Sequence, residues 1–189
     1  MFTELVKKNR SIRFYDDTTV SFSELKSMID DARFSSSTLN KQVIRYILIT
    51  DTQLTKQIFS MTNLPTKAKV PLKNRPKAFI VMIVDKDLQL SERFLYYNIG
   101  IATQNLTLSA TEKELSCIVL HSINFENLDK VLKLDSHKKS VSLIGIGKSI
   151  QKVEIANIEN DTENLTYYEK NDIHMVPKLT TKALVYREI

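Results

Sequence analysis

Hydrophobic residues recur along this chain with two different spacings, which separate predicted helices from predicted strands. A helical pattern follows Ser21, and Glu24 three residues later completes a capping-box signature for a helix start. Asp51 and Asn124 precede two further helical patterns and are suited to cap them. The longest predicted helix covers residues 91–113, and its apolar side is formed by Leu95, Ile99, Ala102, Leu106 and Ala110.

Apolar runs of strand length lie between these helices, at residues 44–49, 78–84, 117–120 and 141–147. The run 78–84 is apolar at every position, which predicts a strand buried on both faces. The polar segment 154–171 favours a loop, and a short amphipathic tail is expected from Val176 onward. Because helices and strands alternate without regular strand–helix–strand repeats, the pattern predicts the α+β class, with a central mixed or antiparallel sheet flanked by helices.

Composition limits the broad class. A chain of 189 residues, 42% hydrophobic and 26% charged, is most simply one globular domain over residues 1–189. No apolar run is long enough to span a membrane, and the start lacks the pattern of a signal peptide. The single cysteine, Cys117, lies in an apolar run and is expected to be a packed core thiol. These features favour a cytoplasmic protein.

The net charge of +5 raises the question of nucleic acid binding. The densest basic patch lacks the interleaved aromatic residues of a single-strand stacking surface, and consists of Lys67, Lys69, Lys73, Arg75 and Lys77. We therefore expect a solvated loop, or a rim that attracts small molecules bearing phosphate, rather than a nucleic acid partner.

Other chemical motifs are weak. Gly145 to Ser149 ends like a phosphate-binding P-loop, but the first glycine of that motif would fall at Ser142 inside a strand. We interpret Gly145 and Gly147 as a strand end whose glycines allow a tight exit, and Gly100 as a site of close helix packing. The histidines are far apart in the sequence and do not predict a metal site: His121, His137 and His174.

The residues Arg10, Ser11 and Arg13, called here the arginine cluster, have the chemistry of a phosphate site. Guanidinium groups form charge-assisted, often bidentate hydrogen bonds to phosphate oxygens. A charged helix end explains the same pattern. A polar segment at residues 36–42, the serine-rich loop, reads Ser-Ser-Thr-Leu-Asn-Lys-Gln and is also explained by an ordinary connection between a helix and a strand.

Together, the order of these segments resembles the nitroreductase family of flavin (FMN) enzymes. Members of this family typically read R-S-x-R near the start and P-S-x-x-N-x-Q some twenty residues later, as in residues 10–13 and 36–42 here. Residues 98–110, N-I-G-I-A-T-Q-N-L-T-L-S-A, resemble the family's central helix, commonly D-x-G-x-A-x-Q-N-L-x-L-A-A. The segment around Lys178 is similar to the family's terminal segment, which carries a basic phosphate ligand.

The resemblance implies cofactor-binding residues for FMN but no catalytic side chain and no metal, because the flavin carries the chemistry. It implies phosphate ligands at Arg10, Ser11, Arg13 and Lys178. It implies Ser36, Ser37 and Asn40 near the flavin ring and ribityl chain. Backbone groups around Leu120 and His121 would face the reactive edge of the ring, and Lys69 or Lys73 would lie near flavin N1.

The resemblance also implies an NAD(P)H-dependent oxidoreductase that reduces small acceptors, such as nitroaromatics or quinones, by ping-pong hydride transfer. It implies a homodimer whose interface includes the long central helix. The alternative is a flavin-binding sensor or carrier without turnover, because several family positions differ here. The departures are Asn9 for an arginine, Ser36 for a proline, Val43-Ile44 for proline-tryptophan, and Glu114-Leu115-Ser116 for G-L-G.

Overall fold

The computed structural model describes residues 1–64, 70–160 and 162–189. They form two compact units, Met1–Ser149 and Ile150–Ile189. The first unit combines helices with an antiparallel sheet, and the second is a small mixed sheet followed by a short helix. This combination confirms the predicted α+β class. The expectation of a single domain over residues 1–189 stays a prediction.

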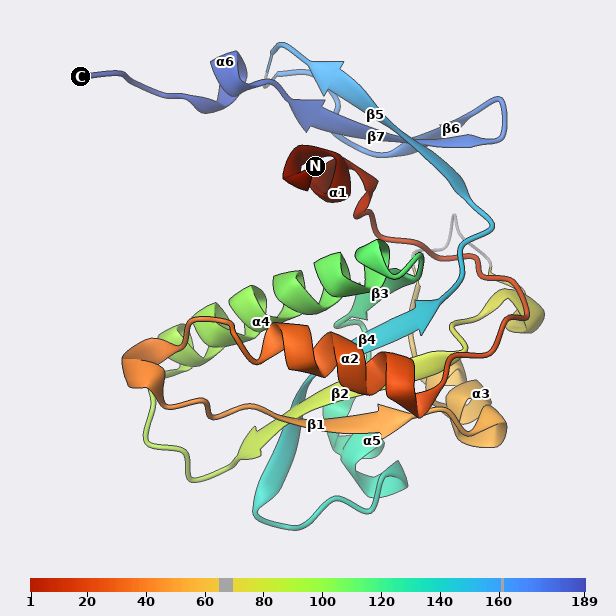
Figure 1. The fold of residues 1–189 in the computed structure, drawn as a ribbon, viewed down its shortest axis with the longest axis vertical. Coiled ribbons are helices and arrows are strands. Elements are labelled where there is room, and N and C mark those ends of the chain that lie inside the picture. Colours follow the sequence, from red (N-terminus) through yellow and green to blue (C-terminus); the bar gives the residue numbers. More distant parts are fainter. Residues whose placement is uncertain (65–69, 161) are drawn as a thin grey trace. The chain divides into compact units, whose positions relative to one another are not determined.

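The sheet of the first unit has the strand order β1-β2-β4-β3, with every neighbouring pair antiparallel (Figure 1). Each strand overlaps an apolar run that predicted it, and β4 begins three residues earlier than expected, at Lys138 rather than at Val141. The strands are β1 (Arg45–Ile49), β2 (Ala78–Asp85), β3 (Ser116–Leu120) and β4 (Lys138–Gly147).

The central strand β2 is buried on both faces, as the unbroken apolar run 78–84 predicted. Alternate residues of β2, from Ala78 to Val84, pack into the main hydrophobic cluster with residues of α2 (Phe22–Ala32) and α4 (Glu92–Glu112). The neighbouring strand β4 contacts α5 (Phe125–Val131). Helices thus cover a sheet whose centre is too apolar to face water.

The helices begin where the capping residues predicted. Ser21 and Glu24 form a complete capping box at the start of α2. Asp51 accepts a hydrogen bond from Leu54 N at 2.7 Å at the start of α3 (Thr52–Ser60). Asn124 accepts one from Asn127 N at 2.9 Å at the start of α5. A short N-terminal helix, α1 (Phe2–Lys8), has no such cap and was not predicted.

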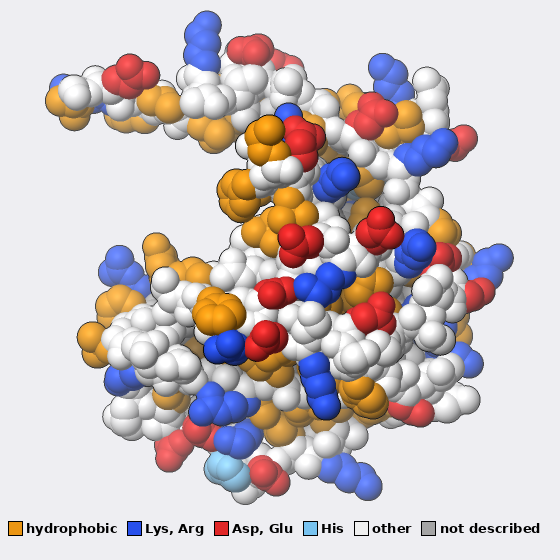
Figure 2. All heavy atoms as spheres, viewed as in Figure 1, with side chains coloured by type: hydrophobic (Ala, Val, Ile, Leu, Met, Phe, Trp, Pro, Cys, Tyr) orange, Lys and Arg blue, Asp and Glu red, His pale blue; other side chains and the backbone are white. Residues whose placement is uncertain are grey.

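The apolar side of α4 predicted from its spacing is buried, and its residues Leu95, Ile99, Ala102, Leu106 and Ala110 are all less than a tenth exposed. The helix nevertheless carries exposed aromatic side chains near its start, at Phe94, Tyr96 and Tyr97. On the face of the first unit shown in Figure 2, Lys and Arg side chains are interspersed with Asp and Glu side chains.

The second unit corrects two expectations. The segment 154–171, expected to be a loop, contains most of β5 (Lys152–Ile158) together with β6 (Tyr168–Lys170). The start of the expected tail, residues 176–179, belongs to β7 (Ile173–Leu179), which pairs in parallel with β5 and is followed by α6 (Thr181–Leu184). Polar residues alternate with half-buried ones along β5, so backbone pairing rather than an apolar run defines this strand.

The three glycines have other structural roles than those expected from the sequence. No glycine of the described chain has positive φ, so Gly145 and Gly147 do not form a tight exit. They allow close packing instead: a Cβ on Gly145 would lie 2.7 Å from Pro76, and one on Gly147 would lie 2.7 Å from Tyr15. Gly100 is exposed, and a Cβ added there would meet no neighbouring heavy atom within 4 Å, so the expected close packing is absent at this position.

Cys117 is 4% exposed, and burial raises the pKa of its thiol to about 12, which confirms the expected core thiol. Among the described residues, no helix is both long and apolar enough to cross a membrane.

Candidate functional site

The arginine cluster follows α1 directly and runs beside the edge strand β3. Ser11 forms a parallel bridge with Cys117, and Ile12 N donates to Cys117 O at 3.0 Å. Ile12 is buried, whereas Ser11 is exposed. The short extended segment therefore turns one residue into the core and leaves the hydroxyl of the cluster open to a ligand.

Arg10 is only partly satisfied by the surrounding protein. Its Nη2 donates to Val6 O at 2.5 Å, while its Nε is buried and donates to no atom in the described part of the chain. Burial lowers the pKa of this guanidinium, because desolvation disfavours its charged form. An anion bound here would supply both the missing hydrogen-bond acceptor and the missing negative charge.

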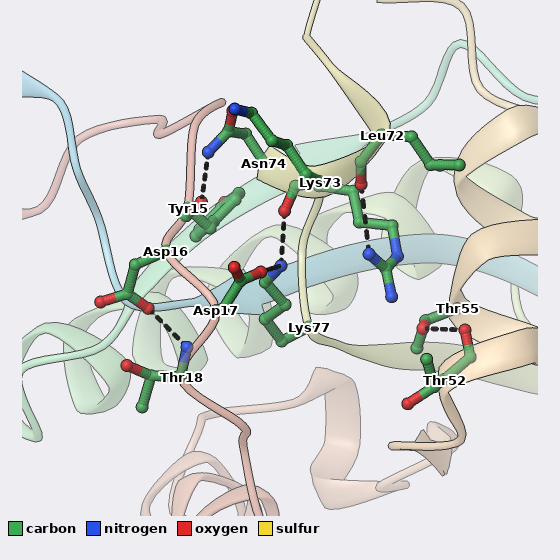
Figure 3. Close-up of polar contacts among 11 residues, drawn as sticks. Tyr15, Asp16, Asp17, Thr18, Thr52, Thr55, Leu72, Lys73, Asn74 and Lys77 are labelled. Atoms are coloured by element: carbon green, nitrogen blue, oxygen red, sulfur yellow. Dashed lines mark hydrogen bonds and ion pairs between the residues drawn. The ribbon is translucent and has the colours of Figure 1, made fainter.

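The chain after the cluster is fixed by the loop that precedes β2 (Figure 3). Tyr15 N donates to Asn74 O, and Asn74 Nδ2 donates to Tyr15 O, both at 3.0 Å. Lys77 Nζ donates to Asp17 Oδ1 at 2.8 Å and to Lys73 O at 2.6 Å, and its side chain is only 8% exposed. Lys77 was expected to be a solvated loop charge and is instead a buried cation that holds two segments together. The residue type alone does not distinguish these two roles.

The serine-rich loop has an unusual backbone. It contains a short 3-10 turn, η1 (Thr38–Asn40), and three non-glycine residues with positive φ: Leu39 at 52°, Asn40 at 54° and Gln42 at 47°. Such residues are uncommon in the left-handed region, and neighbouring structure must hold them there. Ser36 and Asn40 are exposed, and Ser37 Oγ accepts a hydrogen bond from Gln42 N at 3.2 Å.

Polar residues of α4 hold both segments. Asn98 Oδ1 accepts from Thr38 N at 3.0 Å, and Asn105 Nδ2 donates to Ser35 Oγ at 2.8 Å. Asn9, next to the arginine cluster, donates to Thr107 O at 2.7 Å. Polar residues of this helix therefore anchor the two candidate binding segments.

The predicted residues Leu120 and His121 lie at the other end of β3, where the strand ends. Leu120 is buried, and His121 is exposed with its Nε2 3.3 Å from Ser142 Oγ. The phenyl ring of Phe125 stands edge-on to the imidazole, with ring centroids 6.1 Å apart. Since Ser11 pairs with Cys117, the arginine cluster and His121 adjoin the two ends of the same edge strand.

Three further predicted residues belong to other segments of the chain, and their part in the site stays a prediction. Lys178 is an exposed residue of β7 in the second unit, opposite Asn157 of β5. Lys73 is exposed in the short turn η2 (Leu72–Asn74), and Lys69 lies outside the described residues.

Two cavities of the first unit border these segments. One, of about 120 Å³, lies between the serine-rich loop, the end of α2, the start of β1 and Asn98 of α4. The other, of about 390 Å³, lies between the start of α4 and the ends of β2 and β3, and His121 lines it. The larger volume falls in the range of small-molecule sites. Among the described residues, no three His, Cys, Asp or Glu side chains gather in a way that could hold a metal ion.

Sequence reasoning missed the anchoring residues Asn9, Asn98 and Asn105. Asn98 and Asn105 carry a signal, because amide side chains within an otherwise apolar helix need buried partners. Asn9 carries none, because nothing in its flanking sequence indicates a contact with a helix almost one hundred residues away.

Comparison with known proteins gives the family. The model of the nitroreductase family matches residues 6–78 and 56–148, which together span most of the chain. The curated protein "Putative NAD(P)H nitroreductase Spy0809" of Streptococcus pyogenes serotype M6 is 23% identical, over 81% of this chain and 92% of its own length.

Solved structures share the fold. A nitroreductase family protein from Streptococcus pneumoniae TIGR4 superposes with a TM-score of 0.71 at 17% identity, covering 82% of this chain and 93% of that one. An FMN-dependent nitroreductase from Clostridium difficile R20291 gives a TM-score of 0.65 at 22% identity, covering 78% and 87%. With the matched family model and the arrangement of the arginine cluster, serine-rich loop and central helix, the chain belongs to the nitroreductase family of oxidoreductases.

Proposed function

We propose that this protein binds FMN and uses NAD(P)H to reduce small acceptors of the nitroaromatic or quinone type. The observation that carries the proposal is the buried Nε of Arg10, which has no partner among the described residues, next to the exposed Ser11. This is a donor set suited to the terminal phosphate of a flavin mononucleotide. The names of relatives support the cofactors, because one is an FMN-dependent nitroreductase and another is named for NAD(P)H.

The residues present fit such a cofactor. Arg10, Ser11 and Arg13 would hold the phosphate, with Lys178 as a further cation. Ser36, Ser37 and Asn40 would contact the ring and ribityl chain, and the family resemblance implies that they do so across a homodimer. FMN, when bound, supplies the hydride chemistry that links a nicotinamide to an acceptor.

The chain's own contribution is to orient and shield. The contacts of α4 with Asn9, Ser35 and Thr38 fix the two binding segments before any ligand arrives, which reduces the entropy lost on binding. The backbone around Leu120 and His121 would face the reactive edge of the ring, and the cavity of about 390 Å³ beside His121 would receive the nicotinamide or the acceptor.

The phosphate assignment is tested by titrating FMN against the wild type, Arg10→Gln and Arg13→Gln, with quenching of flavin fluorescence as the readout. Each variant should bind at least about tenfold more weakly, since a hydrogen bond to a charged group contributes about 1.5–3 kcal/mol. The matched control is Lys26→Gln, at an exposed lysine of α2, which should bind FMN like the wild type. Equal affinities in all four proteins would refute the phosphate assignment.

The alternative of a flavin-binding sensor or carrier is favoured by one observation. Asn9 occupies a position where the resemblance expects an arginine, and its side chain is committed to α4. Anaerobic addition of NADH or NADPH to the FMN-loaded protein separates the two functions. Bleaching of the flavin absorbance followed by recovery on adding a quinone supports the reductase, and persistent absorbance supports the sensor or carrier.

A further inference from the structure

The cavity of about 120 Å³ beside the serine-rich loop is largely apolar. Its walls come from the end of α2, the start of β1 and the middle of α4, and the side chains that make it apolar are Ala32, Val43, Ile44, Tyr46 and Ala102. An engineered apolar cavity of about 150 Å³ holds one benzene molecule. The space is therefore of the right order for a single ring whose remaining atoms extend toward the opening.

The amide of one polar wall residue, Asn98, is only half satisfied by the described part of the chain. Its side chain is 3% exposed, and its Oδ1 accepts from Thr38 N at 3.0 Å and from Thr38 Oγ1 at 3.1 Å. Because a backbone N–H only donates, Thr38 fixes the amide orientation and leaves Nδ2 as the other atom. This Nδ2 is buried and donates to no atom in the described part of the chain. A buried donor without an acceptor is unfavourable, so a ligand that accepts from it gains affinity.

The charged wall residues are already engaged. Arg33 Nε donates to Asp30 Oδ1 at 2.6 Å, and Arg45 Nη1 donates to Gln42 O at 2.6 Å and to Ile44 O at 2.9 Å. Two guanidinium groups at the walls disfavour a cationic ligand. Asp30 balances the charge of Arg33, and Arg45 Nη1 is held by two backbone carbonyls, so the donor without a described partner is the neutral amide of Asn98, which a neutral acceptor can satisfy.

We propose that this cavity is a binding site for a small neutral molecule with one ring and a carbonyl-type acceptor, which takes its hydrogen bond from Asn98 Nδ2. The site is additional to the proposed flavin site, although Ser36 and Ser37 border it. Binding in this cavity does not depend on the reaction of the flavin. If the cavity binds no such molecule, the proposed function is unaffected.

Acetophenone and α-methylstyrene form a matched pair of probes, because they differ in a carbonyl oxygen against a methylene group. Affinities are measured by calorimetry at pH 8 on the purified protein, with and without saturating FMN. Acetophenone should bind the wild type about fivefold or more tightly than α-methylstyrene, which is the effect of satisfying one buried donor. The affinity should be the same with FMN present.

Asn98→Asp is the matched variant, because it keeps the oxygen that accepts from Thr38 and replaces the donor with a charged acceptor of the same size. The preference for acetophenone should disappear in this variant, because a carboxylate with two hydrogen-bond donors on it stays ionised at pH 8 and has no proton to donate. Ala102→Leu, which fills the cavity, should weaken both probes.

Three outcomes would overturn the proposal. Equal binding of the two probes to the wild type, which needs no variant, would mean that a water molecule or nothing satisfies Nδ2. An unchanged preference in folded Asn98→Asp would place the probe elsewhere. Displacement of acetophenone by FMN would make the cavity part of the flavin site.

Discussion

Asn9 Nδ2 donates to Thr107 O at 2.7 Å, so the residue next to the arginine cluster is tied to the C-terminal part of α4. The same nitrogen donates to Thr111 Oγ1 at 2.9 Å, and Thr107 Oγ1 lies 3.3 Å from Asn9 Oδ1. Both ends of the amide are thus used. The contact fixes the point at which the chain leaves α1 and enters the segment beside β3.

Asn9→Ala should lower the free energy of unfolding by about 1–2 kcal/mol, because it removes more than one part-buried hydrogen bond. Urea denaturation followed by circular dichroism measures the change. Asn127→Ala, at an exposed position of α5, is the control and should change stability by less than about 0.5 kcal/mol. Similar effects of the two substitutions would show that the Asn9 contact contributes nothing specific.

Gly147→Ala should destabilise the protein by about 1–3 kcal/mol through overpacking. The new Cβ would lie 2.7 Å from Tyr15 Cδ1, and Tyr15 is fully buried with its hydroxyl bound to Ile12 O at 2.7 Å, so the ring has little freedom to move. Gly100→Ala is the contrasting change. It places a methyl group in open space on a helix and should stabilise by about 0.5–1 kcal/mol. Thermal unfolding of both variants tests the prediction, and a shift of the same sign would contradict it.

Glu114→Gly should stabilise the protein by about 1 kcal/mol, because Glu114 holds the left-handed position that ends α4. Its φ is 59°, Leu115 N donates to Ala110 O at 2.8 Å, and Glu114 N donates to Thr111 O at 3.2 Å, which together form a Schellman motif. The control is Glu112→Gly, two residues earlier and inside the helix, which should destabilise by about 1 kcal/mol. Denaturant midpoints that move in the same direction would sink this explanation.

The stabilising contribution of Asp31 should be lost as the pH falls into the acidic range. Hydrogen bonds from Lys113 and Ser109, both at 2.6 Å from Asp31 Oδ2, lower the pKa of this carboxyl below its usual range. A pKa that is lower in the folded state contributes stability above the unfolded value of about 4, and this contribution is lost as pH falls through the folded pKa. Asp31→Asn should therefore be less stable than the wild type at pH 7, by a margin that shrinks below about pH 4.

Urea unfolding at pH 7, 5, 4 and 3 measures that margin. Lys113→Met, which removes the main cause of the lowered pKa, should show the same trend from the other partner. A difference between wild type and Asp31→Asn that stays constant from pH 7 to pH 3 would mean that the ion pair does not act through this carboxyl.

The exposed aromatic residues of α4 predict a homodimer contact. Phe94, Tyr96 and Tyr97 are 48%, 53% and 70% exposed, and a twofold contact would bury them. Tyr97→Asp should weaken association, as measured by sedimentation velocity, whereas Phe22→Asp at a similarly exposed aromatic residue of α2 should not.

FMN should tighten the dimer and dilution should release FMN, if the serine-rich loop of one subunit completes the site of its partner. Sedimentation with and without FMN tests this linkage. A stable monomer that binds FMN with full affinity would show that one chain holds the whole site.

The sequence by itself determined the class of the first unit and its main helices and strands, apart from α1. Capping residues such as Ser21, Asp51 and Asn124 act within one turn of chain, so a short window contains all the physics of a helix start. The same holds for the buried strand at 78–84, whose apolar run has no other stable placement. The arginine cluster, the serine-rich loop and the central helix could also be recognised in the sequence, because their order and spacing along the chain need no structure to be read.

Only the tertiary structure decided which side chains are spent on holding the fold and which are left for a ligand. Lys77 and Arg10 are both basic residues in polar segments, yet Lys77 is satisfied by Asp17 and Lys73 O, while Arg10 keeps a buried nitrogen that no described residue satisfies. Likewise, Gly147 and Gly100 differ because a tyrosine far away in the sequence packs against one of them. The reason is physical: hydrogen bonding and close packing depend on distances between segments remote in the sequence, and a local pattern does not contain those distances.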